Sequence, residues 1–79
     1  MEKKIFTNIA YKLIHSAFIC YIPEGITVTW EISADGIHYE PVDNLTDIAG
    51  GNTLQISNGL PGTWFRLTCS EDVELDSIF

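Results

Sequence analysis

The chain has 79 residues, of which 46% are hydrophobic, and its eleven acidic and four basic residues give a formal net charge of −7. This charge excludes a basic surface for nucleic acid and disfavours binding to an anionic membrane, while the apolar fraction is too high for a disordered chain. Residues 1–79 are therefore expected to form one small domain, with no apolar run near the roughly 20 residues needed to span a bilayer.

The stretch from residue 3 to residue 22 fits two interpretations. β-branched and aromatic residues favour strands at residues 5–14 and 17–22, broken near His15. The alternative is a helix, because another set of apolar residues recurs at helical spacing: Phe6, Ile9, Ala10, Leu13, Ile14 and Ala17. The polar residues 1–4 are expected to be loose.

Residues 26–42 (ITVTWEISADGIHYEPV) predict one complete β-hairpin. Val28, Trp30 and Ile32 alternate with polar residues, as on a strand with one buried face. Residues 33–36 (SADG) supply the turn, with Gly36 able to adopt the positive φ of a tight reversal.

The register of this hairpin follows from charge and burial. A two-residue turn would place Glu31 directly opposite Glu40, and such a like-charge pair is destabilising. A three-residue loop would exchange the two faces of the returning strand. A four-residue loop satisfies both criteria and predicts three cross-strand pairs: Ile32 with Ile37, Trp30 with Tyr39, and Glu31 with His38.

The second half of the chain alternates between turns and short strands. Residues 43–52 (DNLTDIAGGN) are rich in Asp, Asn and Gly, which predicts a surface loop. Strands are predicted at residues 53–57, 63–70 and 73–79. Within the second of these, Phe65 and Leu67 are expected to face inward and Trp64 and Arg66 outward.

Six to seven short strands at spacings near ten residues predict an all-β fold. The expected architecture is a small antiparallel β-sandwich, either immunoglobulin-like or jelly-roll-like. Its centre is expected to contain five large side chains: Trp30, Tyr39, Phe65, Leu67 and Leu75.

No constellation of residues predicts catalysis. His15 and His38 are the only candidate bases, and neither has a nucleophile or an orienting carboxylate at a recognisable spacing. We expect no enzymatic activity, no cofactor and no metal, and we interpret the acidic residues near 43–47 and 71–76 as solvated surface rather than calcium ligands. Cys20 and Cys69 permit either one disulfide or two free thiols, and synthesis in a reducing cytoplasm favours the thiols.

Four residues are predicted to contact a partner. Trp64 and Arg66 place an aromatic ring beside a cation on an outward strand face, a combination enriched at interface centres. Ile78 and Phe79 are large apolar residues at the end of the last strand, where polar residues are more usual. Two other roles are open for Trp64, which would either stack on a sugar ring or plug one end of the sandwich.

The run VTWEISADGIHYEPV, followed later by LPGTWFRLT, resembles small β-sandwich virion proteins of tailed bacteriophages. In those proteins a Trp-bearing strand meets an S-x-D-G turn and an aromatic residue. The similarity covers roughly residues 26–69. Similar hairpins occur in fibronectin-like and carbohydrate-binding sandwiches, where they serve the fold.

This resemblance implies a structural role in a phage virion. The expected function is that of an auxiliary (decoration) capsid protein, made in the host cytoplasm and bound to the major capsid protein or another virion protein. A homo-oligomer is also compatible with it. The alternatives are a carbohydrate-binding or tail-fibre adhesion module, for which Trp30, Tyr39 and Trp64 are the candidate sugar platforms, and a small host-directed phage regulator.

Overall fold

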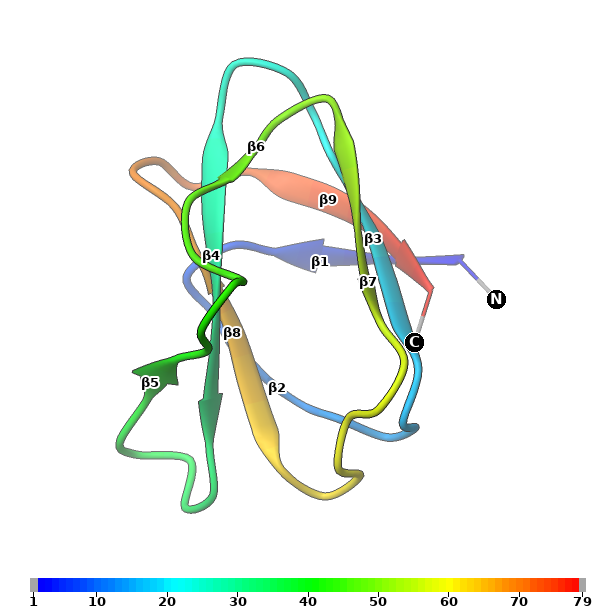
Figure 1. Ribbon diagram of the computed structural model, residues 1–79, viewed down its shortest axis with the longest axis vertical. Helices are drawn as coiled ribbons and strands as arrows, with labels where there is room; N and C mark the ends of the chain where they lie inside the picture. The colour runs from blue at the N-terminus through cyan, green and yellow to red at the C-terminus, as the bar shows by residue number, and fades with distance from the viewer. Residues whose placement is uncertain (1, 79) are drawn as a thin grey trace.

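The computed structural model describes residues 2–78, which form two antiparallel β-sheets that face each other (Figure 1). The first sheet has the strand order β1-β9-β3-β7, and the second has the order β2-β8-β4-β5, with β6 also paired to β4. No helix occurs among the described residues, so the predicted all-β sandwich is confirmed. The strands are β1 (Glu2–Phe6), β2 (Ala10–Lys12), β3 (Phe18–Ile22), β4 (Thr27–Ser33), β5 (Glu40–Pro41), β6 (Ile48–Ala49), β7 (Asn52–Ile56), β8 (Trp64–Thr68) and β9 (Glu74–Ile78).

The core lies between the two sheets and is centred on three aromatic rings. Phe65 stacks on Trp30 with a centroid distance of 4.7 Å, and Phe18 lies 5.0 Å from Trp30 and 4.9 Å from Phe65. The predicted inward residues Leu67 and Leu75 are buried beside them. Because each strand alternates inward and outward side chains, one row of apolar residues per strand suffices to fill this layer.

The predicted strand at residues 5–14 is in fact two strands that belong to different sheets. β1 pairs with β9, whereas β2 pairs with β8. The chain bends at Thr7 and Asn8, where Asn8 has a positive φ of 66°. Thr7 Oγ1 accepts the Val73 N–H at 3.0 Å, and Asn8 Oδ1 accepts the Cys69 N–H at 3.1 Å. Polar side chains therefore satisfy the backbone donors at the point where the chain changes sheets.

The start of the chain is more ordered than its polar sequence predicts. Residues 2–4 belong to β1, and the ladder pairs Glu2 with Ile78 and Lys4 with Asp76. The expectation that residues 1–4 are loose is therefore wrong for residues 2–4, while Met1 lies outside the described residues. The helical alternative for residues 6–17 is not formed.

The predicted hairpin forms with a different register. β4 pairs with β5 through Glu31 opposite Pro41 and Ile32 opposite Glu40, so residues 34–39 form a longer loop than expected. The predicted pairs between Ile32 and Ile37, Trp30 and Tyr39, and Glu31 and His38 are wrong. Gly36 does adopt a positive φ, of 78°.

The side chain of Asp35 accounts for this longer loop. Its Oδ1 accepts the backbone N–H groups of Ile37 and His38 at 2.8 and 2.9 Å. These two amides are therefore turned toward Asp35 and are not available to continue the ladder with β4. Ile37, predicted to pair with Ile32, is 75% exposed as a result.

Two further elements differ from the sequence prediction. Residues 43–52, predicted as a surface loop, contain β6 and return along β4, where the Trp30 N–H donates to the Leu45 carbonyl at 2.9 Å. Leu45 and Ile48 thereby pack against the core. Tyr39 was expected at the centre of the sandwich, but its ring instead lies on the outer side of the second sheet, against Arg66.

Candidate interaction surfaces

The structure divides the predicted contact residues between two opposite faces. Trp64 and Arg66 are outward residues of β8, on the outer side of the second sheet. Ile78 is an outward residue of β9, on the outer side of the first sheet. Phe79 lies outside the described residues. The structure therefore brings Trp64 and Arg66 together but separates them from Ile78, and one flat contact cannot include both groups.

We call the first group the β8 face and define it by Glu31, Tyr39, Trp64 and Arg66. Arg66 donates from Nε and Nη2 to Glu31 Oε1 at 3.0 and 2.9 Å. Its guanidinium carbon lies 4.3 Å from the centroid of the Tyr39 ring, within the range of a cation–π contact. The charge of Arg66 is therefore already paired, and one side of the Tyr39 ring is covered.

Trp64 has close neighbours from its own chain as well. The loop at residues 34–39 lies on it so tightly that a Cβ added at Gly36 would meet the indole Nε1 at 3.1 Å. The Lys12 Nζ lies 5.9 Å from the centroid of the Trp64 ring. Trp64 is half-buried in consequence. This arrangement favours a structural role for Trp64, as a support for the loop.

The loop that covers the β8 face is held by a network around Asp35. In addition to its two backbone contacts, the carboxylate accepts the Ser33 hydroxyl at 2.8 Å, and its Oδ2 lies 2.9 Å from His38 Nδ1. The hydrogen bond from the His38 side chain, followed by the backbone N–H groups, holds the pKa of Asp35 well below its usual range. The same carboxylate raises the pKa of His38, through the hydrogen bond and through its charge.

The β9 face, defined by Ile19, Tyr21, Asp76 and Ile78, is open in comparison. Ile19 lies opposite Ile78 in the ladder between β3 and β9, and Tyr21 is the next outward residue of β3. Tyr21 is 50% exposed and Ile78 is 49% exposed. With Thr53 they line a shallow hollow of about 160 Å³. No loop covers these side chains in the described part of the chain, so their apolar surface faces solvent.

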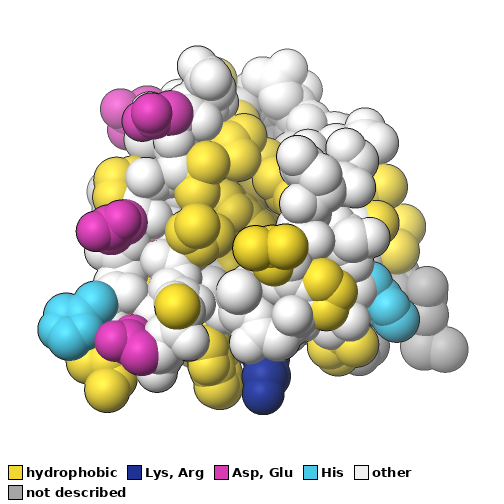
Figure 2. Space-filling view, turned by 60° about the horizontal axis from the view of Figure 1, so that its bottom comes forward, with side chains coloured by type: hydrophobic (Ala, Val, Ile, Leu, Met, Phe, Trp, Pro, Cys, Tyr) yellow, Lys and Arg dark blue, Asp and Glu magenta, His cyan; other side chains and the backbone are white. Residues whose placement is uncertain are grey.

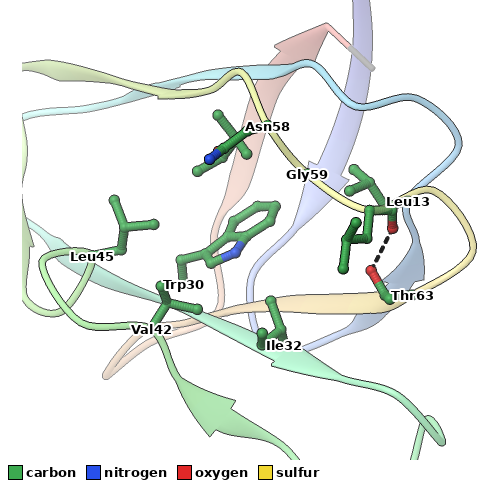
Figure 3. Close-up of a pocket in the computed structure, with 10 residues that line it drawn as sticks. Leu13, Trp30, Ile32, Val42, Leu45, Asn58, Gly59 and Thr63 are labelled. Carbon is green, nitrogen blue, oxygen red and sulfur yellow. Dashed lines mark hydrogen bonds between the residues drawn. The ribbon is translucent and has the colours of Figure 1, made fainter.

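A third surface was missed at the level of sequence. An apolar cavity of about 210 Å³ opens between the two sheets, and we call it the inter-sheet groove. Figure 2 shows it as a hollow with hydrophobic side chains at its floor, and Figure 3 shows Trp30 between Leu45 and Val42 on one side and Asn58 on the other. The lining residues are Leu13, Trp30, Ile32, Val42, Leu45, Ile56, Asn58, Gly59, Leu60 and Thr63.

Two residues of this groove have a sequence pattern that could have indicated an open apolar site. Ile32 follows the alternation predicted for an inward residue, yet it is 45% exposed because it faces this open space. Leu60, an isolated apolar residue between two turn glycines, is 71% exposed at the rim. An apolar residue within a turn segment is the signal that could have indicated an open apolar site.

The described residues contain no group of three or more His, Cys, Asp or Glu side chains placed to hold a metal ion. Cys20 and Cys69 are both free thiols, and burial, with a smaller effect of the Asp76 charge, raises the pKa of Cys20 to about 11. Residues 2–78 form no helix that could cross a membrane.

Comparisons of the chain with protein-family models, with curated proteins and with solved structures return no match.

Proposed function

We propose that this protein is a non-enzymatic structural protein that binds another protein through its outer surface. More specifically, we propose an auxiliary (decoration) protein of a phage virion, bound to the major capsid protein. The β9 face is the contact that we assign to this interaction.

The observation that carries the proposal is the exposure of large apolar side chains on the β9 face. Ile19, Tyr21 and Ile78 adjoin one another across two strands of a sheet, and about half of the Tyr21 and Ile78 side chains faces solvent. Aromatic and aliphatic residues of this kind form the centres of protein interfaces. Their backbone is fixed by the ladder, so binding would order few additional groups.

The assignment to a virion rests on the resemblance of the hairpin and of the later LPGTWFRLT strand. The S-x-D-G segment is compatible with that pattern, since Gly36 has a positive φ and Asp35 organises the loop. The alternative of a sugar-binding module is less well supported. None of the three candidate rings is free to stack on a sugar. Trp30 is buried, the Tyr39 ring packs against Arg66, and Trp64 packs against the loop at Gly36.

The test is to locate the protein in infected cultures. Mass spectrometry of purified particles and of the soluble lysate should find it at high copy number in the particles. A protein found only in the lysate would contradict the virion role, and a soluble one-to-one complex with a host protein would favour a regulator.

Variants then test the contact itself. Tyr21→Asp with Ile78→Asp should remove the protein from the particles while the domain stays folded, with only a modest fall in its thermal unfolding midpoint, because both side chains are half exposed. Ile37→Asp is the matched control, since Ile37 is exposed in the loop of the opposite sheet. Retention of the double variant at the level of the control would show that the β9 face is not the contact.

A further inference from the structure

The inter-sheet groove lies beside a strand with an unpaired edge. β7 is the last strand of the first sheet and has a strand neighbour, β3, along one side only in the ladder of the described residues. Ile56, at the end of β7, and the residues that follow it line the groove. An exposed edge of this kind offers a row of backbone donors and acceptors to an added strand.

The size of the groove indicates what kind of group it accommodates. Its volume of about 210 Å³ is smaller than the roughly 300–1,000 Å³ typical of small-molecule sites. It is an open depression floored by the buried Trp30 and flanked by Val42 and Leu45 (Figure 3). These dimensions suit a single large apolar side chain presented by an extended backbone.

The charge around the groove indicates the chemistry of the occupant. Residues 13–65, which supply all the lining residues, contain no Lys or Arg. The wall at residues 34–43 carries three exposed acidic residues, and Figure 2 shows acidic side chains along one side of the hollow and one basic side chain below it. Those acidic residues are Asp35 and Glu40, which line an adjoining hollow with the groove residue Ile32, and Asp43, which follows the groove residue Val42. An occupant with Lys or Arg beside its apolar residue is complementary to this wall.

A second copy of the chain fits this surface poorly. It would bring the same acidic wall and the same net charge of −7. Two of its four basic residues, Lys4 and Arg66, are already in ion pairs with Asp76 and Glu31. The occupant that the observations favour is therefore a different protein.

We propose that the inter-sheet groove binds an extended segment of the partner protein. The segment adds to the edge of β7, inserts one large apolar side chain over Trp30, and places a Lys or Arg against the wall that contains Asp43. This inference rests on the proposed function, because it assumes that the protein binds another protein. It adds the inter-sheet groove as a second contact, separate from the β9 face.

The proposal is tested with three synthetic peptides. The first, Lys-Thr-Leu-Thr-Leu-Thr-Lys, has the alternation and charge that we predict; the second replaces both Lys by Asp, and the third replaces the central Thr by Pro. Binding is followed by amide shifts of residues 54–60 and by Trp30 fluorescence in a Trp64→Phe background. We expect the first peptide to bind, the Asp peptide to bind at least about tenfold more weakly, and the Pro peptide to lose its effect on the β7 amides.

Variants of the protein complete the test. Leu60→Ser should weaken binding of the first peptide about tenfold, which is the loss expected for one buried leucine contact. Ile37→Ser is a truncation of similar exposure outside the groove and should leave the affinity for this peptide unchanged. Asp43→Asn should weaken it by a smaller factor, and Glu74→Gln on the opposite side should have no effect. Amide spectra of each variant without peptide establish that the fold is intact.

Several outcomes would overturn the inference. These are the absence of binding by the first peptide, equal binding of all three peptides, and equal binding by Leu60→Ser and Ile37→Ser. Concentration-dependent self-association that Leu60→Ser abolishes would assign the groove to a second copy. If the peptides fail while the protein is found in particles, the proposed function stands and only the groove is misassigned. If the peptides bind and the protein is absent from particles, the virion role alone is wrong.

Discussion

The two outer faces of the sandwich carry similar residue types but use them differently. On the β8 face, Arg66 is paired with Glu31 and packed on Tyr39, and Trp64 supports the loop at residues 34–39. On the β9 face, Tyr21 and Ile78 have no such cover in the described structure. The difference comes from the connections, because the long loop after β4 folds over one sheet. An outward aromatic residue is available to a partner only where no loop of its own chain reaches it.

The largest effect that separates the two faces is expected for Trp64→Ala. Removing this half-buried ring takes away the support of the loop at Gly36, so we expect a loss of about 2–3 kcal/mol in the free energy of unfolding. Ile78→Ala, the matched truncation on the β9 face, should cost less than about 1 kcal/mol because its side chain is half exposed. Urea unfolding of both variants measures the difference. Equal losses of unfolding free energy would mean that Trp64 packs against its own chain no more than Ile78 does.

Arg66→Ala is expected to have the next largest effect. Glu31 and Arg66 are only 16% and 33% exposed, so the substitution leaves a largely buried carboxylate without its partner and uncovers Tyr39. We expect a loss of about 1–2 kcal/mol. The control is Lys4→Ala at the ion pair with Asp76, where both side chains are at least half exposed and the loss should stay below about 0.5 kcal/mol. A larger loss at Lys4 than at Arg66 would contradict the distinction between the faces.

Tyr39→Phe should have a small effect of the opposite sign. The Tyr39 hydroxyl is buried and has no hydrogen-bond partner among the described residues, whereas its ring makes the contact with Arg66. Removing the oxygen keeps the ring contact and relieves an unsatisfied polar group, so the stability should be unchanged or higher by about 1 kcal/mol. Thermal unfolding of the variant measures this. A clear loss would show that the hydroxyl has a partner, such as a bound water.

The parts of the fold that were predictable are those set by alternation along a single strand. Phe65, Leu67 and Leu75 follow a period of two and are buried as predicted. Free thiols at Cys20 and Cys69 were also favoured in advance. The outward direction of Trp64 and Arg66 was correct too, since it depends on the same alternation.

The parts that were not predictable depend on polar side chains that capture backbone groups. Asp35 binds two amides of its own loop and thereby shifts the hairpin register, and Thr7 and Asn8 allow one strand to divide between two sheets. Neither effect is visible in a hydrophobic pattern. The inter-sheet groove was missed for a related reason, because Leu45 comes from a segment that was predicted as a surface loop and Leu60 lies between two predicted strands.

The last and smallest test concerns the loop that distinguishes the two faces. Because Asp35 raises the pKa of His38, an NMR titration should place the His38 pKa above the ordinary value of about 6.5, and Asp35→Asn should return it toward that value.

The stabilisation from His38 is present below about 6.5 and is lost as the pH rises through the raised pKa of the folded state. The stabilisation from Asp35 has the opposite dependence: it is present above about 3.9 and is lost as the pH falls through the lowered pKa. The cover over the β8 face should therefore be most stable between these limits. Unchanged titration of His38 in Asp35→Asn would mean that the two side chains are not paired in solution, and that the backbone contacts of Asp35 alone hold the loop over Trp64.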